Sequence, residues 1–546
     1  MKNALILSFI AGLWQLILLA ISLIPVLSKK DNKIISWIII LLKGLSSAMF
    51  YSPLIVSAFV GFALGDVKTA VIIGSVIQLA FIGIFIVGAS TPPDPFLAAV
   101  LAPAFAIIGG LSIGEAIAIV IPLAVLGQAF SIILMTLNVF LLHWGDAMAE
   151  RGHALGIDIL NTVDMLSWSI GPVVTTFLTI RYGTELVKKI PSLIPSFVSG
   201  GLWMTAGMLP ALGFGMLLYM IASGELWPFF FLGFLTAVYL KVTTIALALL
   251  AVCIALIYDR VLYPGKELGF KGKLEGAQVG KLGKLMKSGM LWRSFNFAGN
   301  YNFERLMSLG MTDALIPAFR ALYKTKEEMK NALTRHIKVF YNCHPYFGAA
   351  IMGLMAAMEE KRAEGEPVSD DAITDVKVGL MGPLAGAGDP FFWGTIHPIF
   401  LSLTAALSAK GGLLGFWMAI AFFVTWPIIN HTFFLNYGYT YGTRAIDTVL
   451  KSGILERITK GAKIVAMTII GGMTVQLIHL SVPLKVVVKG ETQLQSIMDN
   501  LLPSLPPLLL LFGVYYLLKK KVNPILIVVI IIALAILGVR FHFLGS

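Results

Sequence analysis

The segment from residue 379 to residue 400, GLMGPLAGAGDPFFWGTIHPIF, limits the possible folds more than any other part of the chain. It is apolar enough for the interior of a membrane, yet it contains five glycines, three prolines, an aspartate and a histidine. Backbone polar groups must be hydrogen-bonded inside a bilayer, so an interrupted helix survives there only where protein or a water-filled cavity surrounds it. A buried ionisable residue such as Asp389 usually marks the path of a substrate or ion. The segment therefore predicts an interrupted membrane helix at a binding region.

The composition extends this prediction to the whole chain. Of the 546 residues, 58% are hydrophobic and 13% are charged, whereas about a quarter are charged in soluble domains. This composition predicts an all-α polytopic membrane protein, and the length of the chain favours more than one domain. The net charge is +1 before Asp259 and +11 from there on. Basic residues beside membrane spans mark the cytoplasmic side, so the excess reflects topology and we expect no nucleic acid partner.

Hydrophobic and charged stretches divide the chain into four parts. Residues 1–35 contain a long apolar run followed by lysines, which predicts an extra N-terminal transmembrane helix. Residues 36–258 and 291–546 form two membrane domains, and residues 259–290 form a basic cytoplasmic linker. The polar segment 143–164 predicts a loop or a surface helix. The segment KKKVNP, at residues 519–524, predicts a cytoplasmic turn between the last two spans.

The first half contains a counterpart of the segment 379–400. The stretch from residue 64 to residue 95 is apolar, carries Asp66 and Gln78, and ends in Pro-Asp94-Pro. Two such Gly/Pro-interrupted segments at matching places in two halves indicate a transporter site built on a repeat. Each residue also has a purely structural interpretation. Asp66 fits a surface ion pair with Lys68, Gln78 fits a hydrogen bond to another helix, and Asp94 fits a helix cap.

The second half offers further polar candidates among apolar neighbours. His397 follows Asp389 by eight residues, and Asn342 and His344 precede a proline in FYNCHPYF. A packing role for each histidine and a capping role for Asp389 are the structural alternatives. The sequence contains no HExxH, no Walker A and no nucleophile motif, and its two cysteines form no metal-ligand spacing. We therefore expect no catalytic residue, no metal and no cofactor in this chain.

Three stretches of the second half resemble the enzyme IID subunit of mannose-family sugar phosphotransferase systems (PTS): RSFNFAGNYNFERLMSLG, RHIKVFYNCHPY and VGLMGPLAGAGDPFFWGTIHP. The first half, through ALGDVKTAVIIGSVIQLAFIG and IPLAVLGQ, resembles the enzyme IIC subunit. The chain thus resembles a natural IIC–IID fusion, with an EIIC-like domain at 36–258 and an EIID-like domain at 291–546.

The resemblance implies two related halves of inverted topology with interrupted or re-entrant helices. It also implies a permease of the bacterial inner membrane that imports a hexose or related sugar by group translocation. A separate phosphorylated EIIB protein, charged through EIIA, then phosphorylates the sugar, so this chain carries no phosphohistidine. The other implied partners are membrane lipids and two further copies of the chain, in a homotrimer. The expected sugar-binding residues are Asp66, Gln78, Asp94, Asn302, Asn342, His344, Asp389, Trp393 and His397.

Two departures from the family pattern bear on the substrate. Gln78 stands where mannose-transporting members carry Glu, and His397 stands where Arg is common. A hydrogen-bonding pocket discriminates hydroxyl patterns strongly, so these changes predict a different hexose, an amino sugar or a substituted sugar. A secondary sugar transporter or facilitator of the same fold without phosphotransfer coupling is the main alternative, and a receptor or scaffold is the third.

Overall fold

A computed structural model describes residues 1–13, 38, 41–42, 44–49, 52–83, 93–183, 195–264, 280–283, 289–297, 300–451, 454–487 and 491–544. The first half forms helices at Lys2–Leu13, α3 (Pro53–Leu64), α4 (Val67–Ala80), α5 (Pro95–Gly109), α6 (Ile113–Glu150), α7 (Ala154–Leu178), η1 (Thr179–Gly183), α9 (Ser196–Met208), α10 (Pro210–Ile221), η2 (Gly224–Leu226), α11 (Trp227–Leu240) and α12 (Thr244–Leu262). The second half forms α14 (Gly289–Ser294), α15 (Ser308–Leu322), α16 (Lys326–Ile337), α17 (Pro345–Ala363), α18 (Asp370–Gly388), η3 (Asp389–Ile396), α19 (His397–Ser408), α20 (Leu414–Lys451), α21 (Ile454–Leu477), α22 (Leu494–Leu501), α23 (Leu505–Lys519) and α24 (Pro524–Arg540). One short antiparallel hairpin joins β1 (Lys485–Val487) to β2 (Glu491–Gln493).

The fold confirms an all-α polytopic membrane protein. Among the described residues, six helices are long and apolar enough to cross a membrane, or seven if the bent pair α22–α23 is one span. Spanning a bilayer takes about 20 apolar residues. The helices α3, α4 and α5 have 12, 14 and 15 residues and are too short to span alone. The inverted relation between the two halves stays a prediction.

The interruption predicted at residues 379–400 takes the form of a π-helix. The helices α18, η3 and α19 run on as one 39-residue helical span, Asp370–Ser408, in which η3 is the π-helical part. Pro390 lies in this part, and a proline inside an α-helix removes one hydrogen bond and clashes with the preceding turn. The wider π-turn accommodates it, and such turns are frequent at functional sites.

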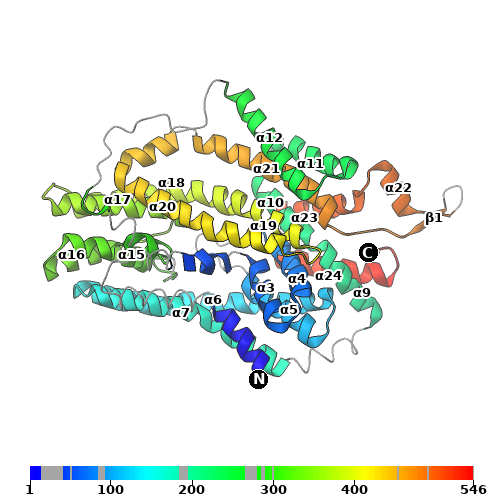
Figure 1. Cartoon of the computed structure of the whole chain (residues 1–546), viewed down its shortest axis with the longest axis horizontal. Coiled ribbons are helices and arrows are strands. Elements are labelled where there is room, and N and C mark those ends of the chain that lie inside the picture. Colours follow the sequence, from blue (N-terminus) through cyan, green and yellow to red (C-terminus); the bar gives the residue numbers. More distant parts are fainter. Residues whose placement is uncertain are drawn as a thin grey trace.

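The polar segment 143–164 forms the tip of a helical hairpin. Helix α6 continues to Glu150, a turn at residues 151–153 follows, and α7 begins at Ala154. In Figure 1 this long hairpin runs along α15 and α16 at one end of the molecule, and α6 packs on α16 while α7 packs on α15. The tip is therefore a docking element between the two halves.

The two halves also interleave along the rest of the molecule. The second-half helix α21 packs against α11 and α12, α24 packs against α9, and α23 packs against α10 (Figure 1). One hydrophobic core joins these helices to the first half, and a second core lies around α15, α17 and α18. The apolar faces that form these cores bring the sequence-distant segments around α4 and α19 together.

Some sequence predictions fall outside the described residues. The N-terminal helix is described only to Leu13, and residues 265–279 and 284–288 of the basic linker are not described. The turn after α23 does connect two apolar helices, because α23 ends at Lys519 and α24 begins at Pro524.

Candidate functional site

The π-helical segment packs directly on the N-terminus of α17. His344 caps α17 by accepting a hydrogen bond from the Tyr346 amide at Nδ1. Gly388, the last residue of α18, lies so close that a Cβ there would be 2.6 Å from His344 Cβ. Side-chain contacts essentially never reach that distance. The glycine is therefore required for the approach of α18 to His344.

Aromatic rings and histidines form a cluster around this contact. The His344 ring stacks on Phe392 with centroids 4.6 Å apart and lies 5.0 Å from Trp393. Trp393 in turn meets the edge of His397 at 4.6 Å. The Tyr346 hydroxyl is 3.4 Å from His397 Nε2. The structure thus brings three of the predicted sugar-binding residues together, and we call His344, Tyr346, Phe392, Trp393 and His397 the aromatic–histidine cluster.

Two of the predicted residues, His344 in the cluster and Asp389 beside it, have polar atoms that make no hydrogen bond to the described part of the protein. His344 accepts at Nδ1, so in its neutral form the ring proton is on Nε2. That buried Nε2 has no hydrogen-bond partner among the described residues. An unsatisfied buried donor costs about 1–3 kcal/mol. The partly buried Asp389 carboxylate also makes no hydrogen bond within the described part of the chain. Both groups are available to a ligand.

Asp389 contributes to the pKa values of two loop residues, Tyr301 and Cys343. Burial, and secondly the nearby Asp389 carboxylate, raises the pKa of the Tyr301 hydroxyl and of the Cys343 thiol. Asn342 is the immediate neighbour of Cys343 and is partly buried. Asp389 follows Gly388, which packs on His344, and Asn342 lies two residues before His344, so both residues are close to the aromatic–histidine cluster.

Asn302 has a different setting. Its side-chain amide donates to Asn300 Oδ1 at 2.7 Å and to the Leu306 carbonyl at 3.1 Å. Its Oδ1 accepts from the amides of Glu304 and Arg305 at 3.0 and 2.8 Å. All the hydrogen-bonding groups of this buried side chain are used, so in this conformation Asn302 shapes its own loop.

Gln78 also makes all its hydrogen bonds to protein. Its Oε1 accepts from the Ser52 hydroxyl at 2.6 Å and from the Leu54 amide at 3.2 Å. Its Nε2 donates to the Leu401 carbonyl at 2.8 Å and to Thr404 Oγ1 at 3.0 Å. Leu401 lies one helical turn beyond His397 on α19. Gln78 therefore connects the first half to the helix that begins in the aromatic–histidine cluster.

The other two first-half candidates lie at helix starts. Asp66 caps α4 by accepting from the Thr69 amide, and Asp94 caps α5 by accepting from the amides of Phe96 and Leu97. Asp94 packs on α6, where a Cβ at Gly127 would be 2.7 Å from Asp94 Cβ. Asp94 makes the capping contact that its sequence setting allows as an alternative, whereas Asp66, for which the sequence allowed an ion pair with Lys68, is also a helix cap.

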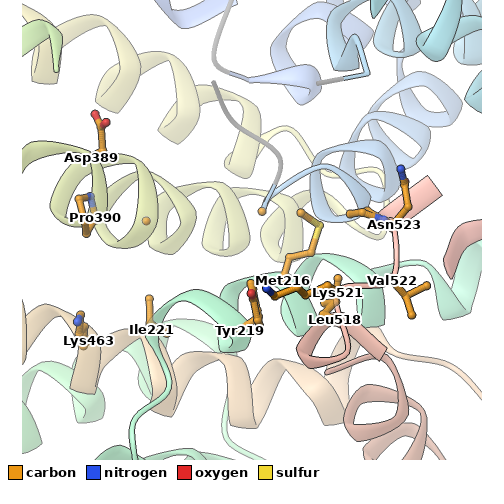
Figure 2. A pocket seen from close by; sticks show the side chains of 13 residues that line it. Met216, Tyr219, Ile221, Asp389, Pro390, Lys463, Leu518, Lys521, Val522 and Asn523 are labelled. Carbon is orange, nitrogen blue, oxygen red and sulfur yellow. The ribbon is translucent and has the colours of Figure 1, made fainter. Parts of the chain in front are cut away.

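A cavity of about 600 Å³ lies on the other side of the π-helical segment. Figure 2 shows Pro390 and Lys463 across from each other at one end, whereas Met216 and Lys521 lie together further along it. In this view the Asp389 carboxylate extends away from Lys463. Both halves contribute to the walls. The lining residues are Gly83, Met216, Tyr219, Ile221, Asp389, Pro390, Gly394, Lys463, Leu518, Lys521, Val522, Asn523 and Pro524.

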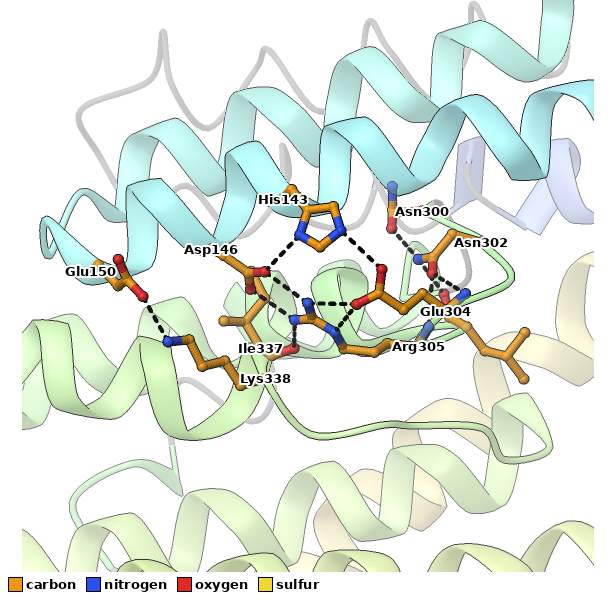
Figure 3. Close-up of polar contacts among 10 residues, drawn as sticks. His143, Asp146, Glu150, Asn300, Asn302, Glu304, Arg305, Ile337 and Lys338 are labelled. Carbon is orange, nitrogen blue, oxygen red and sulfur yellow. Dashed lines mark hydrogen bonds and ion pairs between the residues drawn. The ribbon is translucent and has the colours of Figure 1, made fainter.

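Ion pairs join the halves at the tip of the α6–α7 hairpin (Figure 3). Arg305 donates two bonds to the Asp146 carboxylate, at 2.8 and 2.7 Å, and Lys338 pairs with Glu150 at 2.6 Å. Arg293, which is buried, pairs with both Asp158 and Asp313. In the pairs of Arg305, Lys338 and Arg293 between the halves the first half supplies the acid and the second half supplies the base, whereas His143 and Glu304 pair in the opposite sense. We call these contacts the ion-pair clasp.

A second buried network holds α16 against α17. Glu359 accepts from Arg335 and from His336 Nε2, the latter at 2.8 Å. Burial lowers the pKa of His336 to about 4. Burial of Glu359 opposes its ionisation, but the hydrogen bond from His336 and the charge of Arg335 outweigh it and lower the pKa of Glu359 to about 2. The network is a neutral histidine and an arginine–carboxylate pair that hold two helices together.

The structure adds residues that the sequence did not single out. Tyr346, Phe392 and His431 complete the aromatic surroundings, since the Tyr346 and His431 rings are 5.4 Å apart. His431 lies in the apolar run IINHTFF, and an ionisable residue in a spanning helix is a signal that could have identified it. Lys463 has no such signal. Among the described residues, no three His, Cys, Asp or Glu side chains are arranged to hold a metal ion.

The fold is that of a multi-pass α-helical membrane protein, with a cluster of polar and aromatic side chains at the π-helical segment. Two families match the chain. The family described as PTS system sorbose-specific IIC component matches residues 13–257, and the PTS system mannose/fructose/sorbose family IID component matches residues 281–544. The chain belongs to the mannose/fructose/sorbose PTS family and joins its IIC and IID components, which confirms the resemblance drawn from the sequence.

Two curated relatives, one for each component, agree with this assignment. The mannose-specific EIID component of Escherichia coli K12 is 39% identical over 268 residues, which are 47% of this chain and 93% of that protein. The mannose-specific EIIC component of the same organism is 32% identical over 230 residues, which are 41% of this chain and 86% of that protein. A solved chain titled "Structure of membrane protein" is 39% identical, with 49% of this chain and 100% of that chain covered at a TM-score of 0.45. The protein is a sugar-translocating membrane component of a PTS.

Proposed function

We propose that the chain imports a hexose or related sugar and presents it to a separate phosphorylated EIIB protein. The sugar binds beside the aromatic–histidine cluster. The observation that carries this proposal is the juxtaposition of Trp393 with His344 and Asp389, a ring surface next to polar groups that are free to bind hydroxyls. Rings stack on the C–H faces of sugars, and a few convergent polar groups supply specificity.

The predicted residues divide into two groups in this proposal. His344, Asp389, Trp393, His397 and Asn342 contact the sugar. Asp66, Gln78, Asp94 and Asn302 contact it only after a rearrangement, because their side chains make protein hydrogen bonds in this conformation.

The family also supports the remaining parts of the proposal. The bacterial inner membrane is the location, membrane lipids surround the spanning helices, and three chains form a homotrimer. EIIB, itself charged through EIIA, docks on the basic linker 259–290 and the charged surface after Tyr323. The EIIC-like domain occupies 36–258 and the EIID-like domain 291–546. Residues 1–35 are assigned to an extra N-terminal helix, and the IIC family match, which begins at residue 13, extends into this segment.

Thermal unfolding of the purified chain with a panel of hexoses, amino sugars and substituted sugars tests the site, because a ligand that binds the folded state raises the midpoint. We expect one sugar class to raise it. Trp393→Ala and His344→Gln abolish the rise, whereas Trp144→Ala and His542→Gln, at exposed positions, keep it. A rise that survives both site variants contradicts the proposed site.

Sugar uptake by membrane vesicles tests the coupling. Accumulated sugar is expected to be phosphorylated and to require phosphoenolpyruvate, EIIA and EIIB. Accumulation of free sugar without them would instead establish a secondary transporter.

A further inference from the structure

The cavity beside the π-helical segment is lined by two lysines, Lys463 and Lys521, and by one acidic residue, Asp389, whose carboxylate points away from Lys463 (Figure 2). Lys463, on α21, is partly buried, and Lys521 lies in the turn after α23. Neither ammonium group has an ion pair or a hydrogen bond among the described residues. Removing a charge from water without a partner is costly. The partly buried Lys463 in particular indicates that an anion belongs in this cavity.

The other walls restrict what kind of anion fits. Most of them are apolar and come from spanning helix α10 and from the α23–α24 turn, with Met216, Ile221, Leu518, Val522 and Pro524. A small hydrated anion gains nothing from such walls. A molecule with an anionic head and a hydrocarbon chain satisfies both the lysines and the apolar surface.

The turn after α23 concentrates further positive charge at the cavity. Lys519, Lys520 and Lys521 are consecutive and exposed. Lys521 has φ +60°, a left-handed conformation that is unfavourable for a residue with a side chain, and lies beside Met216 (Figure 2). Lysine clusters next to spanning helices attract anionic lipids, and basic pockets between such helices bind their headgroups.

We propose that this cavity binds an anionic phospholipid, with its headgroup at Lys463 and Lys521 and an acyl chain along the Met216–Leu518 wall. The walls come from both halves of the chain, with Gly83 and Met216 from one and Lys463 and Lys521 from the other. A bound lipid therefore contacts both halves at once.

Native mass spectrometry of the full-length chain tests the proposal, after equilibration in detergent with phosphatidylglycerol or phosphatidylcholine. We expect wild type to retain phosphatidylglycerol at least about tenfold better. Lys463→Gln and Lys521→Gln each reduce that preference about fivefold, the usual contribution of one basic residue to anionic lipid binding. Lys241→Gln is the matched control, since Lys241 is also an exposed lysine with positive φ (+51°) but does not line the cavity.

Thermal unfolding separates a ligand effect from a structural one. Lys463→Gln is expected to raise the midpoint in lipid-free detergent, because it removes an unmatched charge, and to diminish the rise caused by phosphatidylglycerol. Equal retention of the two lipids by wild type overturns the proposal. So does an unchanged preference in the Lys463→Gln/Lys521→Gln double variant. An equal rise in midpoint with inorganic phosphate or with an anionic sugar shows that the cavity takes a small anion instead.

Discussion

The side-chain amide of Gln78 donates a 2.8 Å hydrogen bond to the backbone carbonyl of Leu401, 323 positions away in the sequence. A carboxylate at position 78 could accept from Ser52 and Leu54 as the amide does, but it could not donate to Leu401 or Thr404. The residue type at this position therefore decides whether α4 and α19 are joined by hydrogen bonds in this conformation.

Replacing Gln78 by glutamate is expected to weaken the α4–α19 contact. Gln78→Glu loses two donor bonds and sets a carboxylate against the Leu401 carbonyl, so the free energy of unfolding falls by about 1–3 kcal/mol. Thr404→Val removes one partner of the bond pair and is expected to cost less, about 1 kcal/mol. Chemical denaturation in detergent measures both. A Gln78→Glu protein as stable as wild type contradicts the structural role of this residue.

The glycine at position 388 is expected to be irreplaceable, unlike its neighbour two residues before. Gly388→Ala forces a Cβ against His344, with an expected loss of about 1–3 kcal/mol and of sugar-dependent stabilisation. Gly386→Ala is the matched control, because nothing lies within 4 Å of a Cβ there. Alanine also favours a helix by about 1 kcal/mol over glycine. The midpoint of thermal unfolding should therefore fall for Gly388→Ala and rise for Gly386→Ala. Equal shifts of the two midpoints would refute the packing argument.

The bidentate pair between Arg305 and Asp146 should contribute measurably to stability. Both side chains are largely buried, at 13% and 15% exposed, so removal of one partner leaves the other with weaker contacts only, Glu304 for Arg305 and His143 for Asp146. A double-mutant cycle of Arg305→Ala and Asp146→Ala is expected to give a coupling free energy of about 1–3 kcal/mol. The exposed pair Lys330–Glu327 serves as the control and should give about 0.5 kcal/mol or less. Similar couplings for the two pairs would mean that the ion-pair clasp adds no more than a surface contact.

Acid is expected to weaken the network between α16 and α17 in two steps. His336 has its pKa lowered to about 4, from 6.5, so between those values the unfolded chain binds a proton that the folded chain does not. Stability therefore falls as the pH drops through this window, by up to ~1.4 kcal/mol per pH unit. Glu359, with its pKa lowered from 4.5 to about 2, adds a further loss below pH 4.5.

The variant His336→Gln isolates the first step. Glutamine cannot take up the proton, so the dependence of stability on pH between 6.5 and 4.5 should flatten, although the variant is less stable at pH 7. Denaturation at several pH values provides the measurement, with the exposed His542→Gln as control. An unchanged slope in His336→Gln would assign the acid sensitivity to other groups.

The sequence indicated the helical membrane fold because apolar runs of this length have few alternatives in a bilayer. It also singled out the segment for which we propose sugar binding, since Gly388, Asp389 and Pro390 are unusual within such a run. It could not show that Pro390 is accommodated by a π-turn instead of a break, because a proline in an apolar run is compatible with either. Nor could it show that Gln78 points at α19, or that Lys463 borders a cavity, because both depend on contacts across hundreds of residues.

The ion-pair clasp has a consequence for the covalent linkage of the two halves. Its contacts lie on the helix tips and loops of the two halves, so the chain between α12 and α14 need not fix their geometry. The covalent linkage acts instead by raising the concentration of each half in the neighbourhood of the other. A tether of this kind holds the halves at an effective concentration in the millimolar range and fixes their ratio at one to one. Weak pairs such as Lys338–Glu150 then suffice for assembly, whereas two separate polypeptides would have to find each other by affinity alone.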